Sequence, residues 1–206
     1  MAELIDLSRE IYQGMPVYPG DIEVELEKDK KLEKDGFVNH NLRMGMHTGT
    51  HLDLPAHMIK SEDTVSELEL GSLSGSAKII YAADEEIIEY KKEYSSLIEA
   101  DDIVLIYTGF AEMYGSKEYY EKHPVIDEEM ANFLADKKIK MLGIDMPSPD
   151  RFPYHVHEIL FKNDIYILEN MVNLDKLLGL KSFELLVFPL KIRAEAAPVR
   201  AAALVD

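Results

Sequence analysis

The chain contains no cysteine, which rules out two kinds of site. Without thiols it can form no disulfide and offers no thiolate ligand, so any metal must be held by nitrogen and oxygen atoms. Tryptophan is also absent. Tyrosine still offers a stacking face, with a smaller area than tryptophan and a hydroxyl group.

Basic residues are scarce. Lysine and arginine number 22 against 39 aspartate and glutamate residues, for a formal charge of -17. The densest basic run, residues 28–34, is interrupted by Asp29 and Glu33 and is typical of a solvated surface. We therefore expect no nucleic-acid partner, whereas bound cations would partly offset the negative charge.

Long apolar runs are absent as well. No run approaches the roughly 20 residues that cross a bilayer, and the first 14 residues, MAELIDLSREIYQG, place acids early. We expect a cytoplasmic protein with no membrane partner. With 47% hydrophobic residues, no repeat and no Pro, Gly or Ser linker, residues 1–206 are expected to form a single domain.

Short apolar segments bounded by turn residues predict a sheet core. The expected strands cover residues 4–7, 77–81, 103–107, 141–144, 164–168 and 183–190, and residues 37–46 are consistent with an extended segment. Three short helices are expected over residues 84–90, 127–136 and 174–178, the second with an acid at its start. The pattern predicts a mixed α/β domain.

The stretch HTGTHLDLPAH, residues 47–57, contains three of the seven histidines and one aspartate. In an extended chain these side chains would share one face but would spread over roughly 30 Å, too far for one site. A helix would also place two of the histidines together, but Thr-Gly-Thr is a poor helix sequence. We therefore expect a strand or loop that folds back at Leu54-Pro55 and gathers the four side chains. Imidazole and carboxylate without sulfur suit zinc, manganese or iron(II).

This stretch resembles the H-x-G-T-H-x-D-x-P-x-H signature of the metal-dependent cyclase family, which includes bacterial kynurenine formamidase and isatin hydrolase. The resemblance extends along the chain, through LIDLSREIYQGMPVYPGD, GIDMPSPD and PYHVHEILFKNDIYILENMVNL to FPLKI and PVRAAAL. It implies the swivelling β/β/α fold of the family, with a mixed sheet, and a homodimer.

The resemblance also implies a set of metal ligands. His47, His51 and Asp53 would hold one divalent ion, and His157 and Glu169 would complete a second position. The two carboxylates would bridge the ions. One or two ions are expected, with zinc favoured over manganese.

A separate role falls to the last histidine of the signature. By the resemblance, His57 is the proton donor and acceptor of the reaction. His155 competes with His157 as the later ligand, and His157 is preferred because it precedes Glu169 by the separation that the family uses.

Two positions depart from the formamidases. Tyr18, in the rigid loop GMPVYPGD, stands where they carry a tryptophan that contacts the substrate, and Tyr107 stands where they tend to have arginine. Tyr18 is therefore the expected substrate-binding residue, at a changed position.

Three functions remain open on the sequence. The first is a metal-dependent hydrolase of a small amide, with N-formylkynurenine as the named candidate. The second keeps the site and hydrolyses a cyclic amide or lactone such as isatin. The third is a metal-binding protein of the same fold without turnover, against which His57 argues, because a structural site needs no spare proton carrier.

Overall fold

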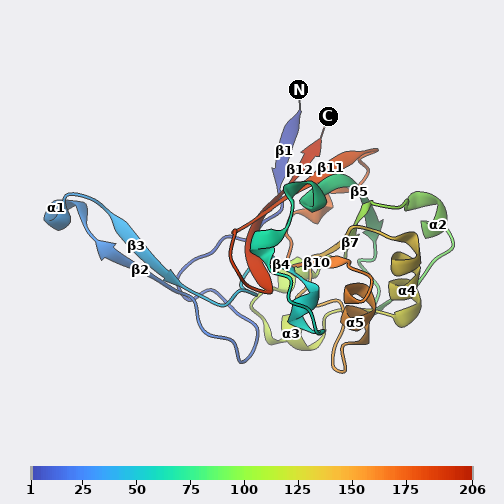
Figure 1. Cartoon of the computed structure of the whole chain (residues 1–206), viewed down its shortest axis with the longest axis horizontal. Helices are drawn as coiled ribbons and strands as arrows, with labels where there is room; N and C mark the ends of the chain where they lie inside the picture. Colours follow the sequence, from blue (N-terminus) through green and yellow to red (C-terminus); the bar gives the residue numbers. More distant parts are fainter. Residues whose placement is uncertain (1, 206) are drawn as a thin grey trace.

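The computed structural model describes residues 2–205, and a sheet that closes on itself organises this part of the chain (Figure 1). The sheet has eight strands in the order β1-β12-β11-β5-β7-β9-β10-β4, and β4 also pairs with β12. Seven of the eight strands therefore form a ring, and β1 extends the sheet beyond β12. The bounds are β1 Glu3–Asp6, β4 His51–Asp53, β5 Ser74–Tyr81, β7 Ile103–Tyr107, β9 Met141–Ile144, β10 Tyr166–Glu169, β11 Phe183–Pro189 and β12 Ala196–Val205.

The ring mixes parallel and antiparallel pairs. Strands β5, β7, β9 and β10 run parallel to one another, whereas β4, β11, β12 and β1 pair antiparallel. The parallel strands read as continuous apolar runs because both of their faces are covered. This architecture confirms the prediction of a mixed α/β fold with a sheet core.

The two faces of the sheet form two cores. On β7, Ile103 and Leu105 pack in a cluster that draws residues from all seven strands of the ring, so it fills the interior. Val104 and Ile106 point the other way, into a second cluster shared with the helices. This alternation follows from the period of two in a strand.

Helices cover the outer face of the sheet (Figure 1). Helix α4, Glu128–Lys137, begins at Asp127, whose carboxylate accepts from the Met130 backbone N–H at 2.7 Å, as expected for residues 127–136. Helix α5, His155–Phe161, packs beside α4 and was not predicted. The shorter helices are α2 Tyr94–Leu97 and α3 Lys117–Glu121, and the 3-10 turns are η1 Pro55–His57, η2 Val65–Glu67, η3 Leu70–Leu73, η4 Phe110–Met113 and η5 Leu174–Leu177.

One expected helix is wrong, another is a 3-10 turn, and several strands have shifted bounds. Residues 84–90 form a turn and the strand β6, Ile87–Ile88, which pairs with β8, Val125–Ile126. The buried side chain of Ile88 joins the outer core, whereas its neighbour Ile87 is exposed, and this alternation is typical of a strand. The strand expected from Asp164 begins at Tyr166, because Asp164 adopts a φ of 56°. The helix expected over residues 174–178 is the 3-10 turn η5.

A long arm leaves the body of the molecule (Figure 1). It consists of the antiparallel strands β2, Glu25–Lys30, and β3, Asn39–Arg43, joined through helix α1, Leu32–Asp35. The extended segment expected over residues 37–46 contains β3. Apolar side chains on the arm are exposed, among them Phe37, Val38 and Leu42. Within residues 2–205, no helix combines the length and the apolar character needed to cross a membrane.

Candidate metal centre and substrate pocket

The histidine-rich stretch folds around the short strand β4. His51 and Asp53 lie on the same face of β4 because they are two residues apart. His47 precedes the strand in a turn through Gly49, whose φ is 64°. After the strand, η1 begins at Pro55 and returns His57 to the site. The expected reversal at Leu54-Pro55 is confirmed.

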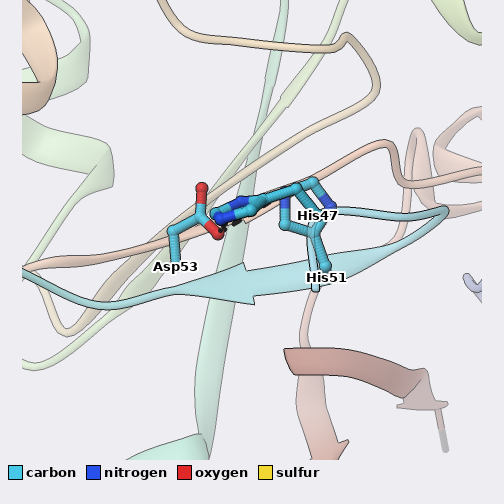
Figure 2. A group of neighbouring side chains, drawn as sticks. All are labelled: His47, His51 and Asp53. Carbon is cyan, nitrogen blue, oxygen red and sulfur yellow. Dashed lines mark ion pairs between the residues drawn. The ribbon is translucent and has the colours of Figure 1, made fainter. Parts of the chain in front are cut away.

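The side chains of His47 and His51 both approach one carboxylate oxygen of Asp53 (Figure 2). Nδ1 of His47 lies 2.9 Å from Oδ1 of Asp53, and Nε2 of His51 lies 3.4 Å from the same oxygen. One donor atom of each residue lies within 4.8 Å of the other two. This spacing is compatible with one ion at the centre, since metal–ligand bonds are about 2 Å long.

A second group shares Asp53 with the first. Asp53, His157 and Glu169 also offer donor atoms that lie within 4.8 Å of one another. Nε2 of His157 is 3.6 Å from one oxygen of Glu169, and Nε2 of His51 is 3.4 Å from the other. Helix α5 carries His157, and the end of β10, paired with β4, carries Glu169. The structure thus brings all five expected ligands together.

Each histidine of the cluster has a partner on the nitrogen that faces away. Nδ1 of His51 donates to the Gly49 carbonyl at 2.9 Å, which leaves Nε2 as the nitrogen facing the site. Nδ1 of His157 lies 2.6 Å from a carboxylate oxygen of Asp150, which is itself buried. Nε2 of His47 lies 3.4 Å from Glu195. Such partners orient ligand imidazoles in metal sites.

The charges in the cluster are strongly coupled. Burial alone would raise the pKa of Asp53, but His51 and His47 hold it well below its usual value. Burial alone would lower the pKa of His51, yet Asp53 and Glu169 raise it well above the usual value. In the same way, His157 loses basicity through burial, but its carboxylate neighbours raise its pKa to about 9. The carboxylates thus favour the protonated forms of His51 and His157 when no metal is bound.

His57 has a different environment. Its ring centre lies 4.2 Å from that of His47 and 6.3 Å from that of His157. Burial lowers its pKa, and the attraction of Asp53 does not reverse the shift. His57 is thus a neutral imidazole at the edge of the cluster, able to accept a proton.

A cavity of about 230 Å³ opens above the cluster. Its walls are aromatic and aliphatic, with few polar groups outside the ligand cluster. The lining includes Pro16, Val17, Tyr18, Met58, Tyr114, Tyr120, Pro147 and Tyr154, together with Ser148 and Asn170. This composition is typical of a pocket for a small organic molecule.

The loop that carries Tyr18 is held over the pocket. The Tyr114 hydroxyl donates to the Pro16 carbonyl at 2.5 Å, and the Asp21 N–H donates to the Tyr18 carbonyl at 3.0 Å. The Tyr18 ring packs edge-on against Tyr120, with the ring centres 5.7 Å apart. The structure thus places Tyr18 in the pocket wall, where the sequence predicted a substrate contact.

Two alternatives that the sequence raised can now be placed. His155 is exposed and lies 2.8 Å from Glu128, outside the cluster, so the structure brings His157 rather than His155 to Glu169. Tyr107, at the end of β7, packs beside Tyr81 with the ring centres 5.8 Å apart and does not line the pocket.

Sequence reasoning gave no role to several residues around the cluster. Asp150 lies in the quoted GIDMPSPD element, and its Oδ2 accepts from the Val156 N–H at 2.7 Å. It precedes the first residue of α5 by five positions, so the usual pattern of a helix cap did not indicate this contact. Asn170, at a φ of 56°, accepts through Oδ1 from the Tyr119 hydroxyl at 2.7 Å. No local pattern indicated that Asn170 lines the pocket.

The fold and the site together define a class of protein. It has a mixed sheet and a cluster of nitrogen and oxygen ligands, suited to a divalent metal, beneath an aromatic pocket. Comparison with known proteins agrees with this class. The Cyclase family model matches residues 5–151. The chain is 34% identical over 206 residues to a kynurenine formamidase of Bacillus cereus, covering 97% of this chain and 96% of the relative. The chain therefore belongs to the cyclase family.

Solved structures show the same fold. A potential metal-dependent hydrolase with cyclase activity aligns with a TM-score of 0.82 at 27% identity, covering 99% of this chain and 98% of that chain. Isatin hydrolase A from Labrenzia aggregata aligns with a TM-score of 0.87 at 24% identity, covering 99% of this chain and 94% of that chain. At that identity, the second likeness shows the fold alone.

Proposed function

We propose that this protein is a metal-dependent hydrolase of a small aryl amide, and that residues 1–206 form one domain for this task. The observation that supports it most directly is the pair of three-residue ligand groups that share Asp53 at the floor of an aromatic pocket. Kynurenine formamidases similar over nearly the whole chain support the reaction class. We take an aryl formamide as the leading substrate, with N-formylkynurenine as the named candidate.

The residues of the cluster fit a divalent ion. Nε2 of His51 and Oδ1 of Asp53 are buried and have no hydrogen-bond partner of good geometry among residues 2–205. Leaving such atoms without a partner is costly, and a bound cation would satisfy both. We propose His47, His51 and Asp53 as ligands of one ion, with His157 and Glu169 completing a second position. The two carboxylates offset half of the charge of two dications, and nitrogen and oxygen ligands suit zinc, which we favour over manganese.

In the proposed reaction, the ions would activate the carbonyl and the water, and the side chains would bind the ions and the substrate. A bound divalent ion would polarise the amide carbonyl and lower the pKa of water towards neutrality. Asp53 and Glu169 would bind the ions and offset part of their positive charge. The aromatic walls, with Tyr18 among them, bind the aryl group and exclude bulk water.

We assign proton transfer to His57. In hydrolysis the oxygen of water forms a bond to the carbonyl carbon, the C–N bond breaks, and the amine leaves with the proton taken from water. His57 is neutral and borders the cluster, so it can accept that proton and return it to the departing nitrogen. The products are formate and an arylamine when the substrate is a formamide.

Cyclic amides and lactones form a second candidate class of substrate. The fold shared with isatin hydrolase A makes a cyclic amide or lactone a candidate for the same site. A metal-binding protein without turnover is less well supported, because the position of His57 beside the cluster would then serve no purpose.

Turnover and metal content together test the proposal. The zinc-loaded protein should hydrolyse N-formylkynurenine, a simple aryl formamide or isatin in a spectrophotometric assay. Asp53→Ala should lose metal and activity together, whereas His57→Ala should retain most metal and lose about 100-fold or more in kcat. His155→Ala is the matched control and should resemble the wild type, since His155 lies outside the cluster. A His57→Ala protein as depleted of metal as Asp53→Ala would make His57 a ligand instead.

A further inference from the structure

The pocket wall contains carboxylate side chains but no lysine or arginine. Among residues 2–205, those that line the pocket include Asp21, Asp53 and Glu169 and no lysine or arginine. Arg9 lies behind the wall, with its guanidinium carbon 3.7 Å from the centre of the Tyr114 ring, and does not line the pocket. A carboxylate on a substrate would therefore find no lysine or arginine in this wall.

Asp21 is the acid of the wall that the metal cluster does not use. It is exposed and follows Tyr18 in the same turn, in which its N–H donates to the Tyr18 carbonyl at 3.0 Å. No lysine or arginine of the described chain lies within 4.0 Å of its carboxylate. Its negative charge thus stands at the pocket rim, beside the proposed aromatic contact, without being neutralised.

Burial in this pocket would penalise an anionic group. The wall around the substrate is formed largely by tyrosine, proline, valine and methionine. Moving a carboxylate from water into such surroundings without a counter-charge is unfavourable. Asp53 and Glu169 offset the positive charge of bound ions only in part. That charge lies at the cluster, where the scissile carbonyl has to sit, and not along the walls around the aryl group. The formal charge of -17 further disfavours the approach of anions over a longer range.

We propose that the site selects uncharged or cationic aryl amides over aryl amides that bear a carboxylate, with Asp21 as the residue at the rim that sets this preference. The inference rests on the proposed function and narrows its substrate class. It ranks an aryl formamide whose only charge is a carboxylate below an uncharged aryl formamide of similar size.

A series of substrates that differ only in charge tests the inference. The three N-formylanilines carry a methyl, an aminomethyl or a carboxylate group at the meta position, and kcat/KM is measured with the zinc-loaded protein at low and high salt. The carboxylate should be hydrolysed about tenfold less efficiently than the methyl compound, and the aminomethyl compound at least as efficiently as the methyl compound. The penalty on the anion should shrink with added salt.

Two rim variants separate Asp21 from the net charge. Asp21→Asn should lower the ratio of aminomethyl to methyl efficiency about threefold, and Asp21→Lys should raise the carboxylate efficiency about threefold to tenfold. Asp84→Lys makes the same change in net charge at an exposed residue outside the pocket, and should alter the three efficiencies by less than about twofold.

Binding of the matched N-acetylanilines, measured calorimetrically, keeps the two proposals distinguishable. If no formamide is hydrolysed but the uncharged ligand binds more tightly than the anion, the proposed function is wrong and the charge preference stands. If the carboxylate compound binds or turns over as well as the methyl compound, the charge preference is wrong, whatever the reaction. An unchanged ratio of carboxylate to methyl efficiency in Asp21→Lys would remove Asp21 as the determinant.

Discussion

At the scale of single residues, the side chains behind the ligands decide how well the cluster is preorganised. Asp150 makes two contacts at once: one oxygen holds Nδ1 of His157 at 2.6 Å, and the other accepts from the Val156 N–H. The carboxylate thereby fixes both the ring and the first turn of the helix that carries it. Removal of such a partner typically weakens metal binding about 10–100-fold.

Asp150→Asn should therefore weaken zinc binding by about that factor, measured by competition with a chromophoric chelator. Asp127→Asn is the matched control, because Asp127 caps α4 with its carboxylate and lies outside the cluster. A purely structural role for Asp150 would make the two variants bind zinc alike, and that result would contradict the prediction.

The protons held by the metal-free cluster predict how metal uptake depends on pH. The pKa of His157 is about 9, because Asp150 and Glu169 outweigh the effect of burial. Below that pH an incoming ion must displace a proton, so zinc affinity should rise as the pH increases from about 6 towards 9. Calorimetry in buffers of different ionisation enthalpy should show proton release on binding at pH 7. An affinity independent of pH over this range would show that His157 is not deprotonated on binding.

At the scale of elements, the loop over the pocket depends on a close approach to the segment before α3. A Cβ at Gly115 would lie 2.8 Å from Cγ of Pro16, and Gly115 has a φ of 83°. Gly115→Ala should therefore displace the Tyr18 loop and raise KM for an aryl substrate at least about threefold, with metal content unchanged.

Gly179→Ala is the control for backbone strain. Gly179 has nearly the same φ, 82°, but a Cβ there would meet no atom within 4 Å. Both variants should lose stability of about 1–2 kcal/mol from the left-handed conformation, seen as a lower melting temperature. If KM rises equally in both, the contact with Pro16 does not position the loop.

At the scale of the whole molecule, the arm is the feature that the isolated chain does not explain. An isolated two-stranded hairpin is only marginally stable in water, and this one exposes Leu32, Phe37, Val38 and Leu42. We propose that a second copy of the chain covers the arm in a homodimer.

Light scattering should give twice the chain mass of 23.5 kDa for the wild type. The double variant Val38→Lys/Leu42→Lys should shift the protein towards monomer, because it places two charges in the proposed interface. Leu70→Lys, at an exposed apolar residue on the body, should leave the mass unchanged. A wild-type mass equal to one chain would contradict the homodimer.

Features set by interactions between residues close in sequence were predictable, whereas features set by long-range contacts were not. Most strands of the ring were predictable because alternating or continuous apolar runs reflect local burial, and α4 was predictable from its cap and its spaced apolar residues. Residues 84–90 were wrongly predicted as a helix, because their acids and isoleucines suit a short helix as well as a strand. Only the pairing of β6 with β8 favours a strand there.

For the site, the sequence by itself determined the chemistry of the ligands. The absence of cysteine restricts them to nitrogen and oxygen, and Pro55 gives the local turn that returns His57 towards His47. The convergence of Glu169 with this stretch was decided by the tertiary structure, since β4 pairs with β10 far along the chain. The same holds for Asn170 in the pocket wall, whose side chain accepts from Tyr119, 51 residues away in the sequence. Such contacts join residues that are distant in sequence, and no local periodicity records which of them the closed sheet brings together.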